Sequence, residues 1–266
     1  MARSNLAAKL AKVRLDKLVH ERGLAVSRER AQALIIAGRV LVDEQKVEKP
    51  GAAVEAASNL RVLGDDLRYV SRGGLKLEAA LEYWRIDLAG KVCLDVGAST
   101  GGFTDCMLQH RAARVIAIDT GYGQIDARLR NDPRVRLLER TNARYLTAEQ
   151  LGEPAEFLAM DVSFISATLV LPAVVNSIRA LVAHTSTPRV LEAVVLVKPQ
   201  FEAGREHVGK GGIVRDPEAQ RMAVEKVSAT MRELGFCKFE VIDSPILGSE
   251  GNKEFLLHAT AELKNA

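Results

Sequence analysis

The sequence has few cysteines, and none of them lies close to another. Its 266 residues contain three, Cys93, Cys106 and Cys237, with no C-x-x-C pair. This spacing excludes a disulfide framework and a zinc knuckle. The five histidines are just as scattered, with no spacing that would place two ligands on one helix face. We therefore expect no metal site.

The sequence also lacks an apolar run of about 18 residues, the length that crosses a membrane. The segment from Met1 to Lys12 has no continuous apolar stretch of the kind found in signal peptides. We therefore expect a cytoplasmic protein with no membrane partner. Aromatic residues make up only 5% of the chain, so base stacking is not expected to be the main source of affinity for a nucleic acid.

Positive charge is unevenly distributed along the chain. Residues 1–54 contain 11 lysines and arginines against 6 aspartates and glutamates, a net charge of +5, whereas the rest of the chain carries −2. Such asymmetry indicates a basic module that meets a polyanion. The alternative is a solvated basic face with no partner.

The basic segment has the pattern of a small α+β module. Apolar residues recur at helical spacing over 15–19, and Ser27 is a good N-cap for a second helix. A hairpin is predicted over 39–47, with its turn at 43–45, ahead of the chain breaker Pro50. The expected order is therefore helix, helix, strands.

From about residue 90 the sequence alternates apolar runs of strand length with helical stretches. The runs are 92–96, 115–118, 135–138, 157–160 and 190–197. This alternation predicts a parallel sheet covered by helices, an α/β fold. Two later runs, 239–242 and 255–257, are joined by a connection with no helical pattern, so we expect them to be antiparallel neighbours.

A glycine-rich loop follows the first of these runs. The segment Asp95-Val-Gly-Ala-Ser-Thr-Gly-Gly-Phe103 lies where a strand ends and a helix begins, which is where open parallel sheets bind ligands. Its G-x-x-x-G-G spacing differs from the G-x-G-x-x-G of pyrophosphate binders, which argues against a nicotinamide-dependent dehydrogenase. Asp119 ends the next strand, where a carboxylate can accept hydrogen bonds from both ribose hydroxyls. Alternatively, Asp95 and the glycines only order the turn.

Four further charged residues lie beside predicted secondary-structure elements. Asp161 and Lys198 follow apolar strands, Glu254 directly precedes one, and Lys76 lies beside an apolar helical stripe. Charges at the strand ends of an open parallel sheet point toward the ligand crevice. The alternative for each pair is a surface salt bridge.

These motifs together resemble the TlyA family, whose members are often labelled hemolysins. The resemblance is carried by Arg72-Gly-Gly-Leu-Lys-Leu, Asp95 to Phe103, Glu139-Arg-Thr-Asn-Ala-Arg, Asp161-Val-Ser-Phe-Ile-Ser, Lys198-Pro-Gln-Phe-Glu and Gly251-Asn-Lys-Glu-Phe. The start of the chain is similar to the S4 RNA-binding domain. The resemblance implies an S4-like domain at 1–66, a linker at 67–72 and a Rossmann-like methyltransferase domain of the FtsJ type at 73–266.

The resemblance also implies an activity and its residues. Family members look like S-adenosylmethionine-dependent 2′-O-methyltransferases of ribosomal RNA, acting on a cytidine of 16S rRNA, 23S rRNA or both. The implied catalytic set is Lys76, Asp161, Lys198 and Glu254. The implied cofactor-binding residues are Asp95, Gly97, Ala98, Ser99, Gly101, Gly102, Phe103, Asp119, Asn142 and Asp161. The residues expected to face RNA phosphates are Arg14, Lys17, Arg28, Arg30, Arg39 and Arg72.

Several alternatives stay open at this point. Lys198 is the expected acceptor of the 2′-hydroxyl proton, and the alternative is that both lysines remain charged and stabilise the developing alkoxide. The glycine-rich basic segment 204–212 either closes over RNA or is a plain surface loop. A non-catalytic ribosome-binding assembly factor is the rival function, and it predicts a broken polar set. A membrane-lytic protein is a further rival, which no apolar or amphipathic segment supports.

Overall fold

The computed structural model describes residues 12–25, 27–63, 68–183, 189–248 and 251–263. Its contacts separate two compact units, Met1–Arg68 and Tyr69–Ala266. None of the helices in the described ranges is long and apolar enough to cross a membrane.

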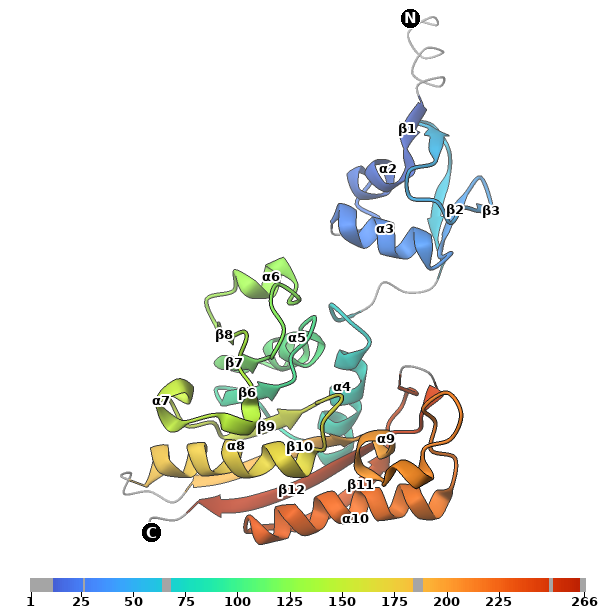
Figure 1. The fold of residues 1–266 in the computed structure, drawn as a ribbon. Coiled ribbons are helices and arrows are strands. Elements are labelled where there is room, and N and C mark those ends of the chain that lie inside the picture. Colours follow the sequence, from blue (N-terminus) through green and yellow to red (C-terminus); the bar gives the residue numbers. More distant parts are fainter. Residues whose placement is uncertain (1–11, 26, 64–67, 184–188, 249–250, 264–266) are drawn as a thin grey trace, which may run out of the picture. The chain divides into compact units, whose positions relative to one another are not determined.

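The first unit packs two helices against short strands (Figure 1). The helices are α2 (Leu15–Glu21) and α3 (Arg28–Ile36). The strands are β1 (Lys12–Arg14), β2 (Val40–Val42), β3 (Gln45–Lys46), β4 (Ala53–Glu55) and β5 (Leu60–Val62). Strand β2 lies between β3 and β5, and β1 pairs with β4. The predicted helices are confirmed, including Ser27 as the cap of α3, whereas β1 was not predicted.

The hairpin turn in this unit is shorter than the sequence predicted. Gln45 already belongs to β3, so the turn consists of Asp43 and Glu44, whose φ angles are 50° and 66°. Two successive residues in the left-handed region are typical of a type I′ turn, which matches the twist of the flanking strands. The prediction of a turn over 43–45 was wrong because the usual Asn-Gly signal of this turn is absent.

The second unit is built on a seven-stranded sheet in the order β11-β12-β10-β9-β6-β7-β8. Its strands are β6 (Val92–Val96), β7 (Arg114–Ile118), β8 (Val135–Leu138), β9 (Phe157–Met160), β10 (Arg189–Val197), β11 (Phe236–Asp243) and β12 (Phe255–Leu263). All neighbours are parallel except at β12, which is antiparallel to both β10 and β11. The predicted strands and the antiparallel pairing of the last two are confirmed.

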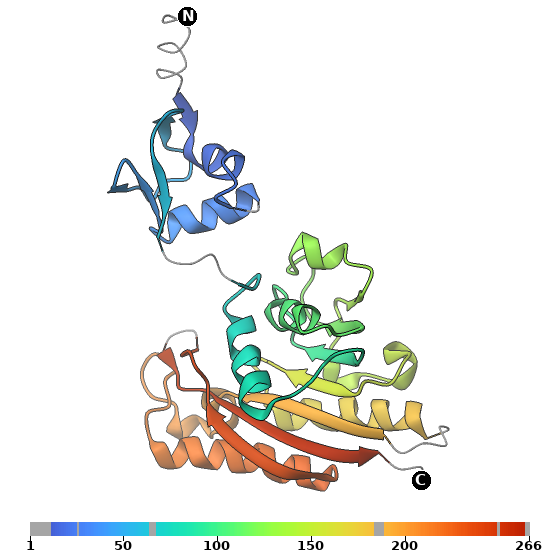
Figure 2. The same ribbon diagram turned by 180° about the vertical axis from the view of Figure 1, so that it is seen from behind.

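Helices cover both faces of this sheet (Figures 1 and 2). One apolar cluster lies beneath α4 (Gly73–Trp84), α5 (Gly102–Gln109) and α6 (Ala127–Arg130), and the other beneath α8 (Ala167–Val182) and α10 (Pro217–Glu233). Short elements complete the unit: η1 (Ala143–Tyr145), α7 (Ala148–Leu151), α9 (Pro199–Glu202) and η2 (Arg205–His207). Along β9, Phe157 and Ala159 enter the first cluster and Leu158 and Met160 the second, as expected of a strand buried on both faces.

Part of the expected linker belongs to the second unit. Tyr69 is buried in the apolar cluster beneath α4, and its hydroxyl donates a hydrogen bond to Glu78 at 3.0 Å. The Val70 N–H donates to Asp105 of α5 at 2.8 Å. Gly74 leaves the space that the Tyr69 ring fills. The second unit therefore begins at Tyr69, ahead of the position 73 that the sequence suggested.

Candidate active site

The polar motifs of the second unit gather at one edge of its sheet. The carboxyl ends of β6, β7, β9 and β10 lead directly into Gly97, Asp119, Asp161 and Lys198. Since these strands are parallel neighbours, their carboxyl ends share an edge. The arrangement follows from the strand order, which residue spacing alone does not give.

A cavity of about 480 Å³ opens at this edge. Five residues assigned to cofactor binding line it: Gly97, Ser99, Asp119, Asn142 and Asp161. The other assigned residues are not among its lining residues: Asp95, Ala98, Gly101, Gly102 and Phe103. The glycine motif therefore contributes its first part to the cavity wall and its second part to packing.

Two positions explain why the first part of the motif is shaped as it is. Gly97 has φ 90°, and a Cβ there would collide with the carbonyl of Asp161, so only glycine lets these two loops approach. The Ser99 N–H donates to Asp119 Oδ2 at 2.7 Å, and the Gly121 N–H donates to Oδ1 at 2.7 Å. These bonds orient the Asp119 carboxylate at the cavity wall, where each oxygen has a further lone pair for a ligand hydroxyl.

The second part of the motif joins α5 to α4. A Cβ on Gly102 would collide with Ser71 Oγ, and the one on Gly101 would collide with the Leu129 side chain. Phe103 is buried in the apolar cluster beneath α4 rather than exposed to the cavity. These residues therefore set the position of the loop.

Asp95 is fully buried behind the loop. Its Oδ2 accepts a hydrogen bond from Thr104 Oγ1 at 2.6 Å, while Oδ1 has no hydrogen-bond partner among the described residues. Burial raises the pKa of Asp95 to about 7, and the nearby Asp161 charge adds to the effect. The carboxyl is therefore poised between its two protonation states near neutral pH.

Asn142 both caps a short helix and lines the cavity. Its Oδ1 accepts a hydrogen bond from the Arg144 N–H at 3.1 Å, which caps η1. The same residue lines the cavity. A capping role therefore does not exclude contact with a bound molecule.

Two ion pairs stand at the same edge. Lys76 Nζ lies 2.5 Å from Glu254 Oε2, and the side chains are only 10% and 2% exposed. Lys198 Nζ lies 2.6 Å from Asp161 Oδ1 and donates to Ser163 Oγ at 2.7 Å. The structure thus groups the four proposed catalytic residues as two acid–lysine pairs.

The register of the sheet brings the pairs together. Val197 of β10 pairs with Phe255 of the antiparallel β12, so Lys198 and Glu254 occupy the next facing positions. Residues that face each other across antiparallel strands have Cβ atoms about 4.5–5.5 Å apart. The register therefore places the Lys198–Asp161 pair next to the Lys76–Glu254 pair.

Phe164 is a feature to which the sequence analysis gave no role. Its ring is 92% exposed, it lines the cavity three positions after Asp161, and it has φ 63°. A left-handed backbone at a bulky residue costs of order 1–3 kcal/mol and persists mainly at functional sites. The ring centroid lies 5.4 Å from that of Phe201. A large aromatic in a polar strand-end motif was the available signal.

Two arginine–tyrosine contacts flank the cavity residues 141–143. The Arg140 guanidinium lies 4.2 Å from the centre of the exposed Tyr122 ring, and that of Arg144 lies 5.7 Å from the Tyr145 ring. Arginine over an exposed aromatic ring is a common platform for single-stranded nucleic acid.

The glycine-rich basic segment 204–212 is tied to the strand-end loop before β12. The Asn252 side chain accepts from the Val214 N–H at 3.0 Å and donates to the Gly212 carbonyl at 2.9 Å. Asn252 is buried and stands two residues before Glu254. The segment is therefore held at its far end beside the Lys76–Glu254 pair.

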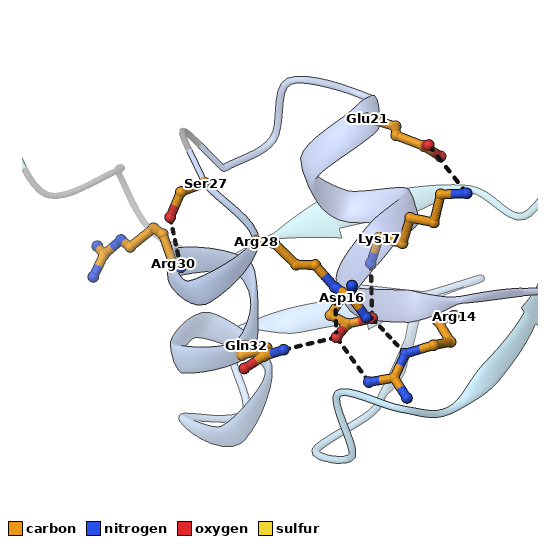
Figure 3. A network of polar contacts seen from close by, with 8 residues as sticks. All are labelled: Arg14, Asp16, Lys17, Glu21, Ser27, Arg28, Arg30 and Gln32. Atoms are coloured by element: carbon orange, nitrogen blue, oxygen red, sulfur yellow. Dashed lines mark hydrogen bonds and ion pairs between the residues drawn. The ribbon is translucent and has the colours of Figure 1, made fainter. Parts of the chain in front are cut away.

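In the first unit, two of the proposed RNA-binding residues share one partner. Arg14 and Arg28 both contact the buried carboxylate of Asp16 (Figure 3). Lys17 follows Asp16 in the sequence, and its ammonium pairs with Glu21 at 3.5 Å. Two of the expected cations therefore contact one acidic residue, while the Lys17 ammonium contacts another.

The remaining proposed RNA-binding residues lie elsewhere. Arg30 points away from Asp16 (Figure 3). The half-buried Arg39 donates to the Leu63 carbonyl at 2.8 Å. Arg72 is exposed at the start of α4 and belongs to the second unit. Within the first unit, Arg30 and Arg39 therefore lie outside the group of contacts around Asp16.

Known proteins resemble this chain over most of its length. The FtsJ-like methyltransferase model matches residues 69–261, and the S4 domain model matches residues 13–58. The 16S/23S rRNA (cytidine-2′-O)-methyltransferase TlyA of Mycobacterium tuberculosis is 46% identical over 92% of this chain and 89% of its own length. Hemolysin A of Brachyspira hyodysenteriae is 40% identical over 92% of this chain and 99% of its own. A solved structure named as a hemolysin, from Streptococcus thermophilus, has 40% identity and a TM-score of 0.70, covering 96% of this chain and 90% of that one.

Proposed function

Because this chain belongs to the TlyA family of FtsJ-like methyltransferases, we propose that it methylates a ribose 2′-hydroxyl of ribosomal RNA with S-adenosylmethionine. The observation that carries the proposal is the pair of acid–lysine contacts, Lys76–Glu254 and Lys198–Asp161, the second of which reaches the wall of the 480 Å³ cavity through Asp161. A non-catalytic binding factor has no need for two neighbouring acid–lysine pairs, one of them nearly buried.

The cavity fits the proposed cofactor. Its volume lies within the range of about 300–1,000 Å³ that is usual for small-molecule sites. The Asp119 carboxylate is oriented to accept hydrogen bonds from ribose hydroxyls, and Asn142 stands beside it for contact with a base. Gly97 and Ser99 of the glycine-rich loop form part of the wall. S-adenosylmethionine, when bound, supplies an electrophilic methyl group on a sulfonium.

Lys198 is the residue that we assign to the reacting hydroxyl. A ribose hydroxyl is a poor nucleophile, so it needs alignment to about 3–3.5 Å and help in losing its proton. The Lys198 ammonium is held between Asp161 and Ser163, a geometry in which it donates to the developing alkoxide while Asp161 fixes its direction. If Lys198 instead acts as the base, it must be neutral when the hydroxyl binds.

An arginine substitution separates these two roles. Lys198→Arg keeps a positive charge and cannot act as a base. Partial activity in this variant indicates alkoxide stabilisation, whereas a loss as complete as in Lys198→Ala indicates proton acceptance.

RNA contacts are proposed on both units. Exposed cations of the first unit bind phosphates and release counterions, and Phe164 stacks on a base next to the reacting ribose. The Mycobacterium tuberculosis relative is named for cytidine in both 16S and 23S rRNA, and a Campylobacter jejuni relative, 32% identical, for 23S rRNA alone. We propose cytidine as the target nucleoside, in the RNA of one or both ribosomal subunits. Such a substrate places the enzyme in the cytoplasm.

The test is transfer of labelled methyl from S-adenosylmethionine to purified 30S and 50S subunits by the wild type, Lys198→Ala and Lys91→Ala. Lys91 is the matched control, because it forms an ion pair with Glu192 at 3.2 Å but precedes β6, at the opposite edge of the sheet. Transfer by the wild type and the control, but not by Lys198→Ala, is expected. If the wild type binds RNA but transfers no label, the protein is a non-catalytic assembly factor instead.

A further inference from the structure

Asp16 is an acidic residue at the centre of a basic surface. It opens the first turn of α2 and is 0% exposed. Six hydrogen bonds reach its carboxylate: two from Arg14, two from Arg28, one from the Gln32 side chain and one from the Lys17 N–H (Figure 3). These bonds, with that of Arg14 foremost, hold the pKa of Asp16 well below its usual range, so the carboxylate is charged at neutral pH.

The two arginines are fixed without being covered. Arg14 and Arg28 each point Nε and Nη2 at Asp16, and their side chains remain 54% and 46% exposed. A guanidinium has five N–H donors in a rigid fork. The edge that does not face Asp16 is therefore presented to solvent in a fixed direction.

Stability alone gives little reason for this arrangement. A buried carboxylate loses its hydration, and a buried ion pair can often be replaced by apolar residues with no loss of stability. Leu15 and Leu18 beside it already belong to the apolar core. Electrostatics also opposes it, because an extra negative charge weakens the attraction of this surface for a polyanion.

We infer that Asp16 is a positioning residue that holds Arg14 and Arg28 as a preorganised pair for the phosphates of the RNA. This inference rests on the proposed function. Long side chains lose rotamer freedom when they bind a phosphate, and fixing them beforehand removes that cost from the binding step. Asp16 therefore strengthens RNA binding through its neighbours, in spite of its own charge.

The sign of one charge change tests the inference. Asp16→Asn and Glu21→Gln each remove one negative charge from α2, and Glu21 is an exposed partner of Lys17 rather than of the arginines. Charge alone predicts that both variants of the full chain bind ribosomal subunits more tightly. Positioning predicts that Asp16→Asn raises the Kd about fivefold to tenfold, since two ordered side chains are released, while Glu21→Gln leaves it unchanged or lower.

Charge-conserving variants keep the test decisive if Asp16→Asn fails to fold. Arg14→Lys and Arg28→Lys preserve the charge but cannot span both carboxylate oxygens. Arg61→Lys is the matched control, because Arg61 makes the same two-nitrogen contact with Glu44 in this unit and is 55% exposed. We expect Arg14→Lys and Arg28→Lys to raise the Kd about threefold or more and Arg61→Lys to leave it within twofold.

Two readouts separate the failure of this inference from failure of the proposed function. The positioning role would be overturned if folded Asp16→Asn bound ribosomal subunits as tightly as Glu21→Gln. It would also be overturned if Arg14→Lys and Arg28→Lys bound them as tightly as Arg61→Lys. Either result would count even if the wild type methylates RNA. Wild-type protein that neither binds nor methylates ribosomal subunits would overturn both.

Discussion

The Lys76–Glu254 pair allows stability and chemistry to be separated. Both side chains are almost fully buried and their charged atoms lie 2.5 Å apart. Lys76→Met leaves Glu254 as an uncompensated buried charge, which costs about 3–5 kcal/mol. In a unit of this size, 1 kcal/mol corresponds to about 2–4 °C, so the variant should melt roughly 6–20 °C below the wild type. The double variant Lys76→Met/Glu254→Leu replaces the pair by apolar groups and should recover to within about 1 kcal/mol of the wild type.

Calorimetry and methyl transfer on the same samples provide the assay. Lys91→Met is the control, because its pair with Glu192 is more exposed and should cost only about 0–1 kcal/mol. We expect the double variant to be folded, stable and inactive, which would show that the pair serves catalysis rather than folding. The reasoning is refuted if Lys76→Met melts with the wild type, or if the double variant is as unstable as the single one.

Three further predictions concern single residues. Burial raises the pKa of Asp95 to about 7, so the folded state holds a proton that the unfolded state releases near pH 4. The free energy of unfolding should therefore fall as the pH rises from 5 to 7, by at most roughly 1.4 kcal/mol per pH unit. In urea titrations, Asp95→Asn should flatten this dependence on pH. Phe164→Ala should raise the KM for ribosomal subunits by a factor that corresponds to about 1–3 kcal/mol of binding free energy, with no loss of melting temperature. An unchanged KM would show that Phe164 does not contact the RNA. Glu202, whose pKa is raised by burial, accepts hydrogen bonds from Ser166 and the Ala167 N–H at the start of α8. Glu202→Gln should lower the free energy of unfolding by about 1–3 kcal/mol. An unchanged denaturant midpoint would contradict a stabilising role for these hydrogen bonds.

The regular parts of the fold followed from local pattern. The strands β6, β8 and β9 begin and end where their runs of mainly apolar residues do. The clearest case is β9, which is buried at all four positions and apolar throughout. Ser27 was recognisable as a cap since its hydroxyl can replace a missing backbone partner.

Contacts between distant segments could not be predicted in this way. Lys76 and Glu254 are separated by 178 positions, and their meeting depends on the packing of α4 beside the reversed strand β12. The burial of Phe103 and the docking of Tyr69 likewise depend on how α4 and α5 pack. Motif resemblance named the four catalytic candidates, but the strand order and the packing of α4 explain why they are neighbours.

The position of the transferred methyl group tests the central claim most directly. Subunits treated with the enzyme and labelled S-adenosylmethionine can be digested to nucleosides and analysed by mass spectrometry, with Lys198→Ala as the blank. The proposed function predicts that the label appears as 2′-O-methylcytidine and is absent from the blank. Label on a base, or equal label in the blank, would contradict a mechanism in which Lys198 acts on a ribose hydroxyl.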